Sequence, residues 1–431
     1  MIPDSTLLPS STQLCFFFVL MVPLALAGMA LVNAGLGRSH SSAHSMLSAV
    51  SVIAIAAIVY STVGFSWQSM AGQPVHTFIL GGKPWNWLGA GALGLSGGML
   101  DHFSPSLTAL FQILCVALAA IIPLSSGADR WRLGGICAST SLFAAFTYPI
   151  FAHWVWGGGW LSQLGANFGL GHGFTDLGGA ATIQAVAGLN ALTIAWILGP
   201  RQNKYGPGGM AAAIPGHNTL VALLGCMLML PGWIGLNAAG ALLFSGISMA
   251  HVPLIAINTL LSAGASGLAA VVLTRIRFTK SDASLSANGW VAGLVASSAT
   301  CAVVTPLAAV AIGAIAGVLV VYTVELLELR VMLDDPAGAI SVHAVAAIWG
   351  LLAMGLFSIG NPAGQMLAQW VGVATLLGFV LPLTYTLNWI ANRFIPYRVD
   401  EHGELHGMDL HELGAGAYPE FVVHGDDSRR R

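Results

Sequence analysis

The sequence predicts an all-α integral membrane protein with eleven transmembrane helices. Of its 431 residues, 56% are hydrophobic and only 7% are charged, and the mean hydropathy is +0.79. A soluble domain could not hide so much apolar surface. The apolar segments lie close to the roughly 20 residues that a helix needs to cross a bilayer. They are Leu14–Leu36, Met46–Phe65, Leu107–Leu124, Leu133–Trp156, Gly178–Leu198, Thr219–Phe244, Val252–Leu273, Leu285–Val304, Leu307–Leu327, Ile340–Ile359 and Met366–Ile390.

The basic residues predict the orientation of these spans. Lys and Arg collect in the cytoplasmic loops of membrane proteins. If the N-terminus lies outside and the C-terminus inside, 14 of the 15 Lys and Arg residues fall on the inner side, and only Lys83 falls outside. We therefore expect an N-out, C-in protein. The first 37 residues carry one charged side chain, Asp4, so Leu14–Leu36 is interpreted as a retained span and not as a signal peptide.

Two of the predicted helices begin in the same way. Asp176 lies eight residues before Gln184, and Asp335 lies eight residues before His343. In each case a carboxylate is followed by one large polar side chain within an otherwise apolar run. Polar side chains inside a membrane are functional candidates, because their burial is unfavourable. The repetition therefore predicts a paired site.

The two openings predict an inverted repeat of spans 1–5 and 6–10. Asp176 begins the fifth predicted span and Asp335 begins the tenth, so the two helices start from opposite faces of the membrane. Transporters built from such repeats place their substrate site near the midplane. Gln184 and His343 each lie about 12 Å deep at 1.5 Å per residue. We expect their side chains to face each other.

Four segments in chain order resemble the ammonium transporter family (Amt/Mep/Rh). The resemblance is carried by Ala152–Gly159 (AHWVWGGG), Asp176–Gln184, Gly232–Ala238 (GWIGLNA) and Asp334–His343. It continues in the C-terminal tail, through Gly407–Leu410 to Ala417–Pro419.

The resemblance implies a homotrimer of eleven-helix protomers in the plasma (cell inner) membrane, with a hydrophobic pore in each protomer. The resemblance also implies that ammonium is recruited at an outer vestibule, loses a proton and passes as ammonia along a pore lined, in the family, by two facing histidines. Trp156 matches the vestibule tryptophan, whose ring face attracts a cation. Asp176 matches the buried aspartate that supports recruitment, and His343 matches the second pore histidine.

The chain departs from the family pattern at four positions. Gln184 takes the place of the first pore histidine, and Leu236 takes the place of the second gate phenylalanine. Cys115 takes the place of the outer gate phenylalanine, since it lies fourteen residues before Asp129 of the family's acidic-arginine motif. Gly240 falls where a vestibule serine usually donates a hydrogen bond.

These departures change the expected chemistry. A carboxamide does not titrate, so we expect no proton wire through Gln184 and His343, although Gln184 can orient His343 or accept a hydrogen bond from ammonia. Cys115 and Leu236 remove two aromatic faces from the outer constriction. Phe111, one turn before Cys115, is the candidate substitute. Recruitment is thus assigned to Trp156, Asp176, Gly240 and Cys115, and pore lining to Gln184, His343, Leu236 and Phe111.

Several of these residues also have a structural interpretation. Gln184 could form an interhelical hydrogen bond worth about 1 kcal/mol in lipid. Asp176 could cap a helix N-terminus, where the helix dipole favours a carboxylate. Trp156 could belong to the aromatic belt at the membrane surface. His343 could be a satisfied core histidine, although the repeat favours a functional role.

We predict transport of ammonium or ammonia through a hydrophobic pore in each protomer. Two alternatives remain open: an ammonium-binding sensor with little conduction, and a channel for another small neutral solute. No arrangement of a nucleophile and a base points to an enzyme, and we expect no cofactor, no metal and no nucleic-acid partner.

The predicted domains are a transmembrane domain, residues 1–395, and a cytoplasmic C-terminal tail, residues 396–431. The tail is polar and acidic. In the family this tail packs beneath the pores and couples the protomers. A trimeric nitrogen-signalling protein at the cytoplasmic face is the candidate partner.

Overall fold

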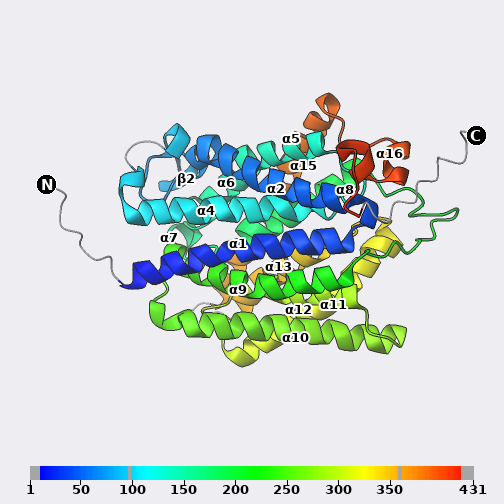
Figure 1. Ribbon diagram of the computed structural model, residues 1–431. Helices are drawn as coiled ribbons and strands as arrows, with labels where there is room; N and C mark the ends of the chain where they lie inside the picture. Colours follow the sequence, from blue (N-terminus) through cyan, green and yellow to red (C-terminus); the bar gives the residue numbers. More distant parts are fainter. Residues whose placement is uncertain (1–9, 96–98, 358–361, 419–431) are drawn as a thin grey trace, which may run out of the picture.

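The computed structural model describes residues 10–95, 99–357 and 362–418. These residues form a bundle of long helices that run side by side, together with one β hairpin (Figure 1). The hairpin pairs β1 (Val75–Leu80) with β2 (Lys83–Gly89) and lies at the same end as the start of α1 (Ser10–Leu36); we call this the hairpin end. The opposite end carries α16 (Glu401–His406), and we call it the tail end (Figure 1).

Many of the helices continue from one named element into the next. Up to residue 198, the remaining elements are η1 (Ser39–Ser41), α2 (Ser42–Val59), η2 (Tyr60–Gly64), α3 (Phe65–Gln68), η3 (Leu93–Leu95), η4 (Met99–Asp101), α4 (Phe103–Ile121), η5 (Ile122–Leu124), α5 (Leu133–Leu142), η6 (Phe143–Thr147), α6 (Tyr148–Val155), α7 (Leu164–Phe168), η7 (Ala180–Ala185) and α8 (Val186–Leu198). After residue 198 they are α9 (Thr219–Phe244), η8 (Met249–His251), α10 (Val252–Phe278), α11 (Ala283–Ser297), α12 (Pro306–Leu326), η9 (Leu327–Val331), η10 (Ile340–Val345), α13 (Ala346–Leu356), α14 (Pro362–Thr375), η11 (Leu376–Val380), α15 (Leu381–Phe394) and η12 (Asp409–Leu413).

The described residues contain nine helical stretches that are long and apolar enough to cross a membrane. A tenth apolar stretch, Ile340–Leu356, is shorter, and α11 has 15 residues. Each of the eleven predicted segments overlaps one of these helices. The chain therefore forms a mostly helical membrane protein. The count of eleven membrane crossings remains a prediction.

Some predicted boundaries were wrong. The segment Leu285–Val304 ends as a helix at Ser297, because the backbone hydrogen bonds then change to a tighter turn pattern: the Thr300 N–H donates to the Ser297 carbonyl oxygen at 3.0 Å. The second helical stretch begins at Ser39 and not at Met46. The end of the predicted segment Ile340–Ile359 lies outside the described residues.

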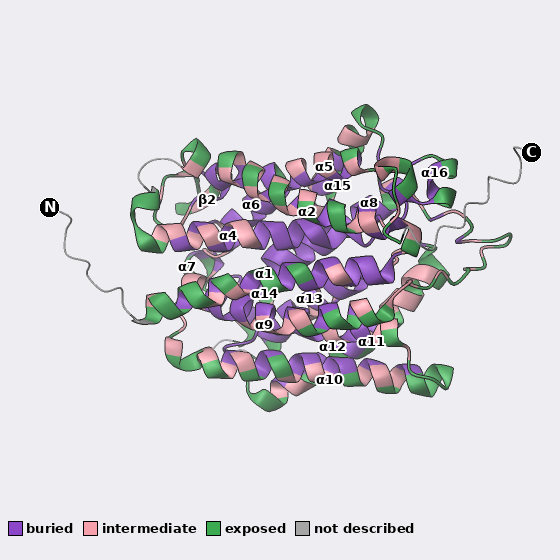
Figure 2. Ribbon diagram, in the orientation of Figure 1, coloured by how far each residue is buried: buried purple, intermediate pink, exposed green. Residues whose placement is uncertain are grey.

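The outer surface of the bundle is apolar, as a lipid-facing surface must be. Large side chains along α1 remain exposed at positions that share one helix face, including Phe17 at 59% and Leu20 at 52%. On α10, Leu268 and Ile276 are exposed at 66% and 74%. Figure 2 shows this alternation of buried and exposed residues on the outer helices. Water is a poor solvent for such a surface, and a bilayer is a good one.

Two helices at the centre of the bundle begin with a π-helical segment, which is wider than an α-helix. The π-helices η7 and η10 have six residues each and lead into α8 and α13. Each begins after a carboxylate and a glycine with a left-handed backbone, Gly179 at φ +91° and Gly338 at φ +72°. In η7 the turn is π-type, since the Gln184 N–H donates to the Gly179 carbonyl oxygen at 3.0 Å.

Carboxylates accept from the first N–H groups of both helices; Asp176 is buried and Asp335 is half-buried. The Asp176 carboxylate accepts from the N–H groups of Gly179, Ala181 and Thr182 at 2.8–3.1 Å and from the Thr182 hydroxyl at 2.9 Å. The Asp335 carboxylate accepts from the Ile340 N–H at 2.8 Å. Each helix therefore begins at a carboxylate that supplies the missing acceptor.

The two opened helices approach each other very closely. A Cβ atom added to Gly188 of α8 would lie 2.3 Å from the backbone nitrogen of Ala344 in η10. No side chain fits there without movement of one backbone. Gly188 thus sets the distance between the two helices one turn beyond Gln184.

An ion-pair network holds the tail end together. Asp334 receives two N–H donors from the Arg201 guanidinium, at 2.9 and 3.0 Å, and Arg130 donates to its carbonyl oxygen at 2.9 Å. Arg201 also donates to Asp129 at 3.1 Å, and Asp129 pairs with Arg38 at 3.2 Å. Burial alone would raise the pKa of Asp334, but Arg130 and Arg201 lower it to about 2. The network lies directly before Asp335 and anchors the start of η10.

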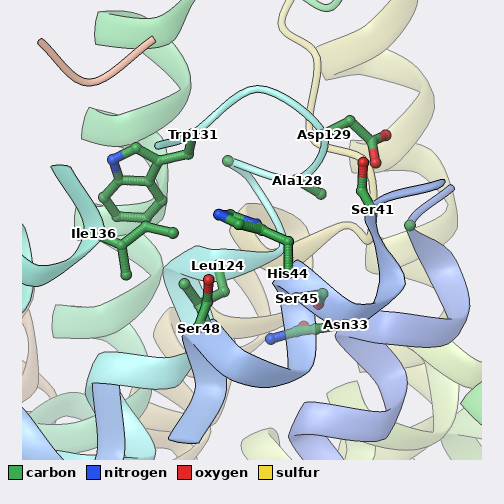
Figure 3. Close-up of a pocket in the computed structure, with 12 residues that line it drawn as sticks. Asn33, Ser41, His44, Ser45, Ser48, Leu124, Ala128, Asp129, Trp131 and Ile136 are labelled. Atoms are coloured by element: carbon green, nitrogen blue, oxygen red, sulfur yellow. The ribbon is translucent and has the colours of Figure 1, made fainter. Parts of the chain in front are cut away.

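The described part of the tail docks onto two helix N-termini. The Asp409 carboxylate accepts from the N–H of His44 at 2.7 Å, near the start of α2, and Glu412 accepts from the N–H of Leu133 at 2.8 Å, at the start of α5. Glu412 also contacts the His44 ring at 2.9 Å. Beside His44, Trp131 and Ile136 line a gap of about 20 Å³ (Figure 3), which has room for about one water molecule.

Replacement of Gly188 by Ala should destabilise the protein. The added methyl group meets the backbone of η10, and such overpacking costs roughly 1–3 kcal/mol. Thermal unfolding of the purified protein measures the effect. Gly264→Ala is the matched control, because a Cβ atom there meets no atom within 4 Å. An equal unfolding temperature for both variants would contradict the close crossing.

Replacement of Asp334 by Asn should leave Arg201 and Arg130 short of a buried partner and destabilise the protein by roughly 3–5 kcal/mol. The folded-state pKa of Asp334 is about 2, below its ordinary value of 3.8, so the native stabilisation is present above pH 4. The stability difference between the native protein and Asp334→Asn should therefore narrow as the pH falls from 4 toward 2. Denaturation at a series of pH values measures it, with the exposed Asp101→Asn as control. A difference that stays constant over this range would contradict the assignment.

Candidate functional site

Gln184 and His343 meet in the middle of the bundle. Gln184 lies on η7 and His343 on η10, and their side chains are 0% and 3% exposed. The Gln184 Oε1 atom lies 2.8 Å from His343 Nδ1. An amide oxygen has no hydrogen to donate, so in this orientation Nδ1 carries the ring proton and Nε2 keeps its lone pair. The contact fixes the tautomer of His343.

The pair presents one donor group and one acceptor. Among the described residues, Gln184 Nε2 is buried and has no hydrogen-bond partner. His343 Nε2 is left as an acceptor by the tautomer. A buried polar atom without a partner is rare in a folded protein and needs an explanation. A small polar solute beside the pair would supply one.

An aromatic cluster lies on the hairpin-end side of this pair. It consists of Phe111 on α4, Trp156 directly after α6, and Phe244 at the end of α9. The Trp156 and Phe244 rings are stacked, with centroids 4.7 Å apart and an angle of 9° between the planes. Phe111 packs against both rings, with centroids at 6.3 and 5.9 Å. Trp156 is held in place, because its Nε1–H donates to the Asp176 carbonyl oxygen at 2.8 Å.

Phe244 was missed by the sequence analysis. It lies four residues after Gly240 on one face of α9, and this i, i+4 spacing was the available signal. The stack with Trp156 could not be inferred from the sequence, since the two rings come from segments far apart in the chain.

The other predicted recruitment and gate residues are close-packed. Cys115 and Leu236 are each 0% exposed, on α4 and α9. A Cβ atom added to Gly240 would lie 2.5 Å from the Leu177 carbonyl oxygen, next to Asp176. Gly240 therefore lets α9 touch the backbone that leads into η7, and a serine at this position would need that backbone to move.

Two cavities lie on the tail-end side of His343. The first is small, about 10 Å³, and is lined by His343, Asn288 and Ser125 among others. The second has a volume of about 470 Å³ and is also lined by Asn288. It carries both acidic and basic groups, including Glu328, which pairs with Lys204. Asn288 thus lies at the boundary between the His343 cavity and the large polar cavity.

Ser341 adds a polar group to the large cavity. It lines this cavity, is 0% exposed, and its hydroxyl oxygen has no hydrogen-bond partner among the described residues. From the hairpin end to the tail end, the central helices therefore offer an aromatic cluster, a fixed amide–imidazole pair and a polar cavity. A membrane-embedded helical bundle with this arrangement belongs to the class of small-solute transporters and channels.

Comparison with known proteins identifies the family within this class. The profile of the Ammonium Transporter Family matches residues 13–418, and the chain belongs to this family. It is 33% identical to the ammonium transporter Amt2 of Archaeoglobus fulgidus over 432 residues, which covers 95% of this chain and 87% of that protein. It is 32% identical to an ammonium transporter of Bacillus subtilis, with coverage of 95% and 99%.

Solved structures show the same fold. A protein described as a sensor Amt protein superimposes with a TM-score of 0.84 at 26% identity, covering 93% of this chain and 98% of that chain. Mep2 of Candida albicans superimposes with a TM-score of 0.76 at 22% identity, covering 95% of this chain and 90% of that one. At that identity the Mep2 match supports the fold alone.

The tautomer of His343 can be measured directly. We expect ¹⁵N NMR of histidine-labelled protein to show a protonated Nδ1 and an unprotonated Nε2 for this residue, because Gln184 Oε1 can only accept. The signal is assigned by its loss in His343→Gln. In Gln184→Leu, which puts an apolar side chain of similar size at this position, the preference for Nδ1–H should disappear. Protonation of Nε2 in the native protein would show that the amide faces the other way.

Proposed function

We propose that this chain transports ammonium across the plasma (cell inner) membrane, and that ammonia is the species that passes the centre of each protomer. The observation that carries the proposal is the buried Gln184–His343 pair, which lies where two capped helices cross and has a small cavity on its tail-end side. Membership of the ammonium transporter family and the named relatives support the same function.

Trp156 is the proposed recruitment residue at the outer end of the pore. The face of its ring attracts an ammonium cation, and this attraction is worth up to about 2 kcal/mol once water is excluded. Asp176 supports this site without contacting the cation. Its carbonyl oxygen accepts from the Trp156 indole N–H, and its carboxylate accepts from N–H groups at the start of η7. In this proposal Phe111 replaces the aromatic wall that Cys115 does not supply.

Gln184 and His343 are the proposed selectivity pair. Ammonia has one lone pair and three N–H bonds, so it can accept from Gln184 Nε2 and donate to His343 Nε2. Ammonium has no lone pair and cannot accept from Gln184. The pair therefore favours the neutral species, and the fixed amide leaves no continuous route for a proton. Leu236 and Cys115 contribute apolar lining, and Gly240 allows the close packing that surrounds it.

The proposed exit leads through Asn288 into the tail-end cavity. Solute leaving His343 meets the Asn288 side chain and then the 470 Å³ cavity. Its lining carries charged groups of both signs, so an ion is more stable there than between the apolar helices. Protonation there would return the solute to its charged form.

The topology and assembly belong to the same proposal. Eleven spans, N-out and C-in, with spans 1–5 and 6–10 as an inverted repeat, place the hairpin end outside and the tail end in the cytoplasm. Residues 1–395 form the transmembrane domain of a homotrimer. Residues 396–431 form the cytoplasmic tail, of which residues 419–431 lie outside the described part, and a trimeric nitrogen-signalling protein is the candidate partner at that face.

The experiment is reconstitution of the native protein and Gln184→His in liposomes of one lipid composition. An ammonium gradient should alkalinise the lumen faster in native proteoliposomes than in protein-free liposomes, without ammonium-evoked current, because only ammonia passes the pair. Gln184→His should add a current, since two imidazoles can exchange a proton.

Other outcomes would change the proposal. Native current would show that charge crosses without a second imidazole and would refute neutral passage. Ammonium binding by calorimetry with alkalinisation no faster than in protein-free liposomes would favour the sensor, the description given to one structural neighbour. Equal flux of a small neutral solute such as glycerol would favour an unselective pore.

A further inference from the structure

We infer that Phe244 is a lid over the recruitment site, which must rotate away before a small cation can reach the face of Trp156. The inference rests on the proposed function, in which Trp156 binds ammonium. It adds a residue that controls access to that site and sets its apparent affinity.

The stacking geometry means that the Phe244 ring and a cation cannot occupy the same face of Trp156 at the same time. A cation–π contact requires the cation over the ring face. The Phe244 ring is nearly parallel to Trp156 at a centroid distance of 4.7 Å, so it occupies one face at van der Waals separation. No cation fits between rings at this distance. Phe244 and ammonium therefore compete for the same surface.

Trp156 cannot turn away to expose a different surface. Its indole N–H is bound to the Asp176 carbonyl oxygen at 2.8 Å. Phe111 packs against the ring, and a Cβ atom on Gly179 would lie only 3.2 Å from Trp156 Cη2. The Trp156 ring is 6% exposed and is enclosed on the sides that Phe244 does not cover.

Phe244 is the member of the cluster that is free to move. Phe111 is 0% exposed in the middle of α4, whereas Phe244 is only partly buried and is the last residue of α9. The next residue, Ser245, has left the helical conformation, and Gly246 has a left-handed backbone at φ +62°. A rotation about the side-chain torsions of Phe244 opens the cluster without moving the central helices.

The lid lowers the apparent affinity for the cation. If only a fraction of molecules has Phe244 rotated away, the apparent dissociation constant rises by the inverse of that fraction. The stability of one aromatic pair corresponds to about a 3- to 10-fold population difference. Removing the ring should therefore tighten cation binding by about 3- to 10-fold.

The test is calorimetric titration of the full-length purified protein with methylammonium chloride. Phe244→Ala and Phe244→Leu should both bind about 3- to 10-fold more tightly than the native protein, because neither side chain stacks on Trp156. Phe244→Tyr keeps the ring and should bind with native affinity. Phe103→Ala is the matched control, since Phe103 lies at the start of α4, is 36% exposed and pairs edge-on with Phe16.

The outcomes separate the lid from the site beneath it. If Trp156→Ala abolishes binding but Phe244→Ala binds with native or weaker affinity, Trp156 is the site and the lid is refuted; weaker binding would mean that Phe244 contributes to the cation site. If Trp156→Ala binds as tightly as the native protein, or if no variant binds, the recruitment role of Trp156 fails and the lid fails with it. Binding that is seen only in Phe244→Ala and Phe244→Leu supports the lid.

Discussion

Two carboxylates at helix N-termini, those of Asp176 and Asp335, are the constraint on which the centre of the structure depends. The first N–H groups of a helix have no partner within the helix, and the bundle interior has little water to replace one. Asp176 supplies the acceptor for η7 and Asp335 supplies it for η10. Because each carboxylate fixes where its helix begins, it also fixes how deep Gln184 and His343 lie.

The same two aspartates, Asp176 and Asp335, lie in segments that connect the central pair to the two ends of the bundle. The Asp176 carbonyl oxygen holds Trp156, so the aromatic cluster and the opening of η7 share one residue. On the other side, Asp335 follows Asp334, which is bound by Arg201 in the ion-pair network. A shift of either helix opening would therefore move the central pair together with the contacts at one end.

The Gln184–His343 pair at the centre of the bundle is polar and has a fixed arrangement of donor and acceptor. An imidazole pair can reverse its donor and acceptor roles, whereas an amide oxygen facing His343 Nδ1 allows only one arrangement. The pair is thus directional, with Gln184 Nε2 as donor and His343 Nε2 as acceptor. This arrangement suits a neutral solute with both a lone pair and N–H bonds. In the proposed function, the aromatic cluster and the tail-end cavity are therefore where the charged form is bound.

The sequence by itself determined the helical membrane class, the order of the apolar segments and the family, because composition, segment length and motif order are properties of the chain alone. It also indicated the two helix openings, since Asp176 and Asp335 repeat at the same spacing from a polar residue. The tertiary structure decided which atom of Gln184 faces His343, that the α11 helix stops at Ser297, and that Phe244 covers Trp156. Each of these depends on contacts between segments distant in sequence, where a shift of one helical turn would change the partner without altering the apolar pattern.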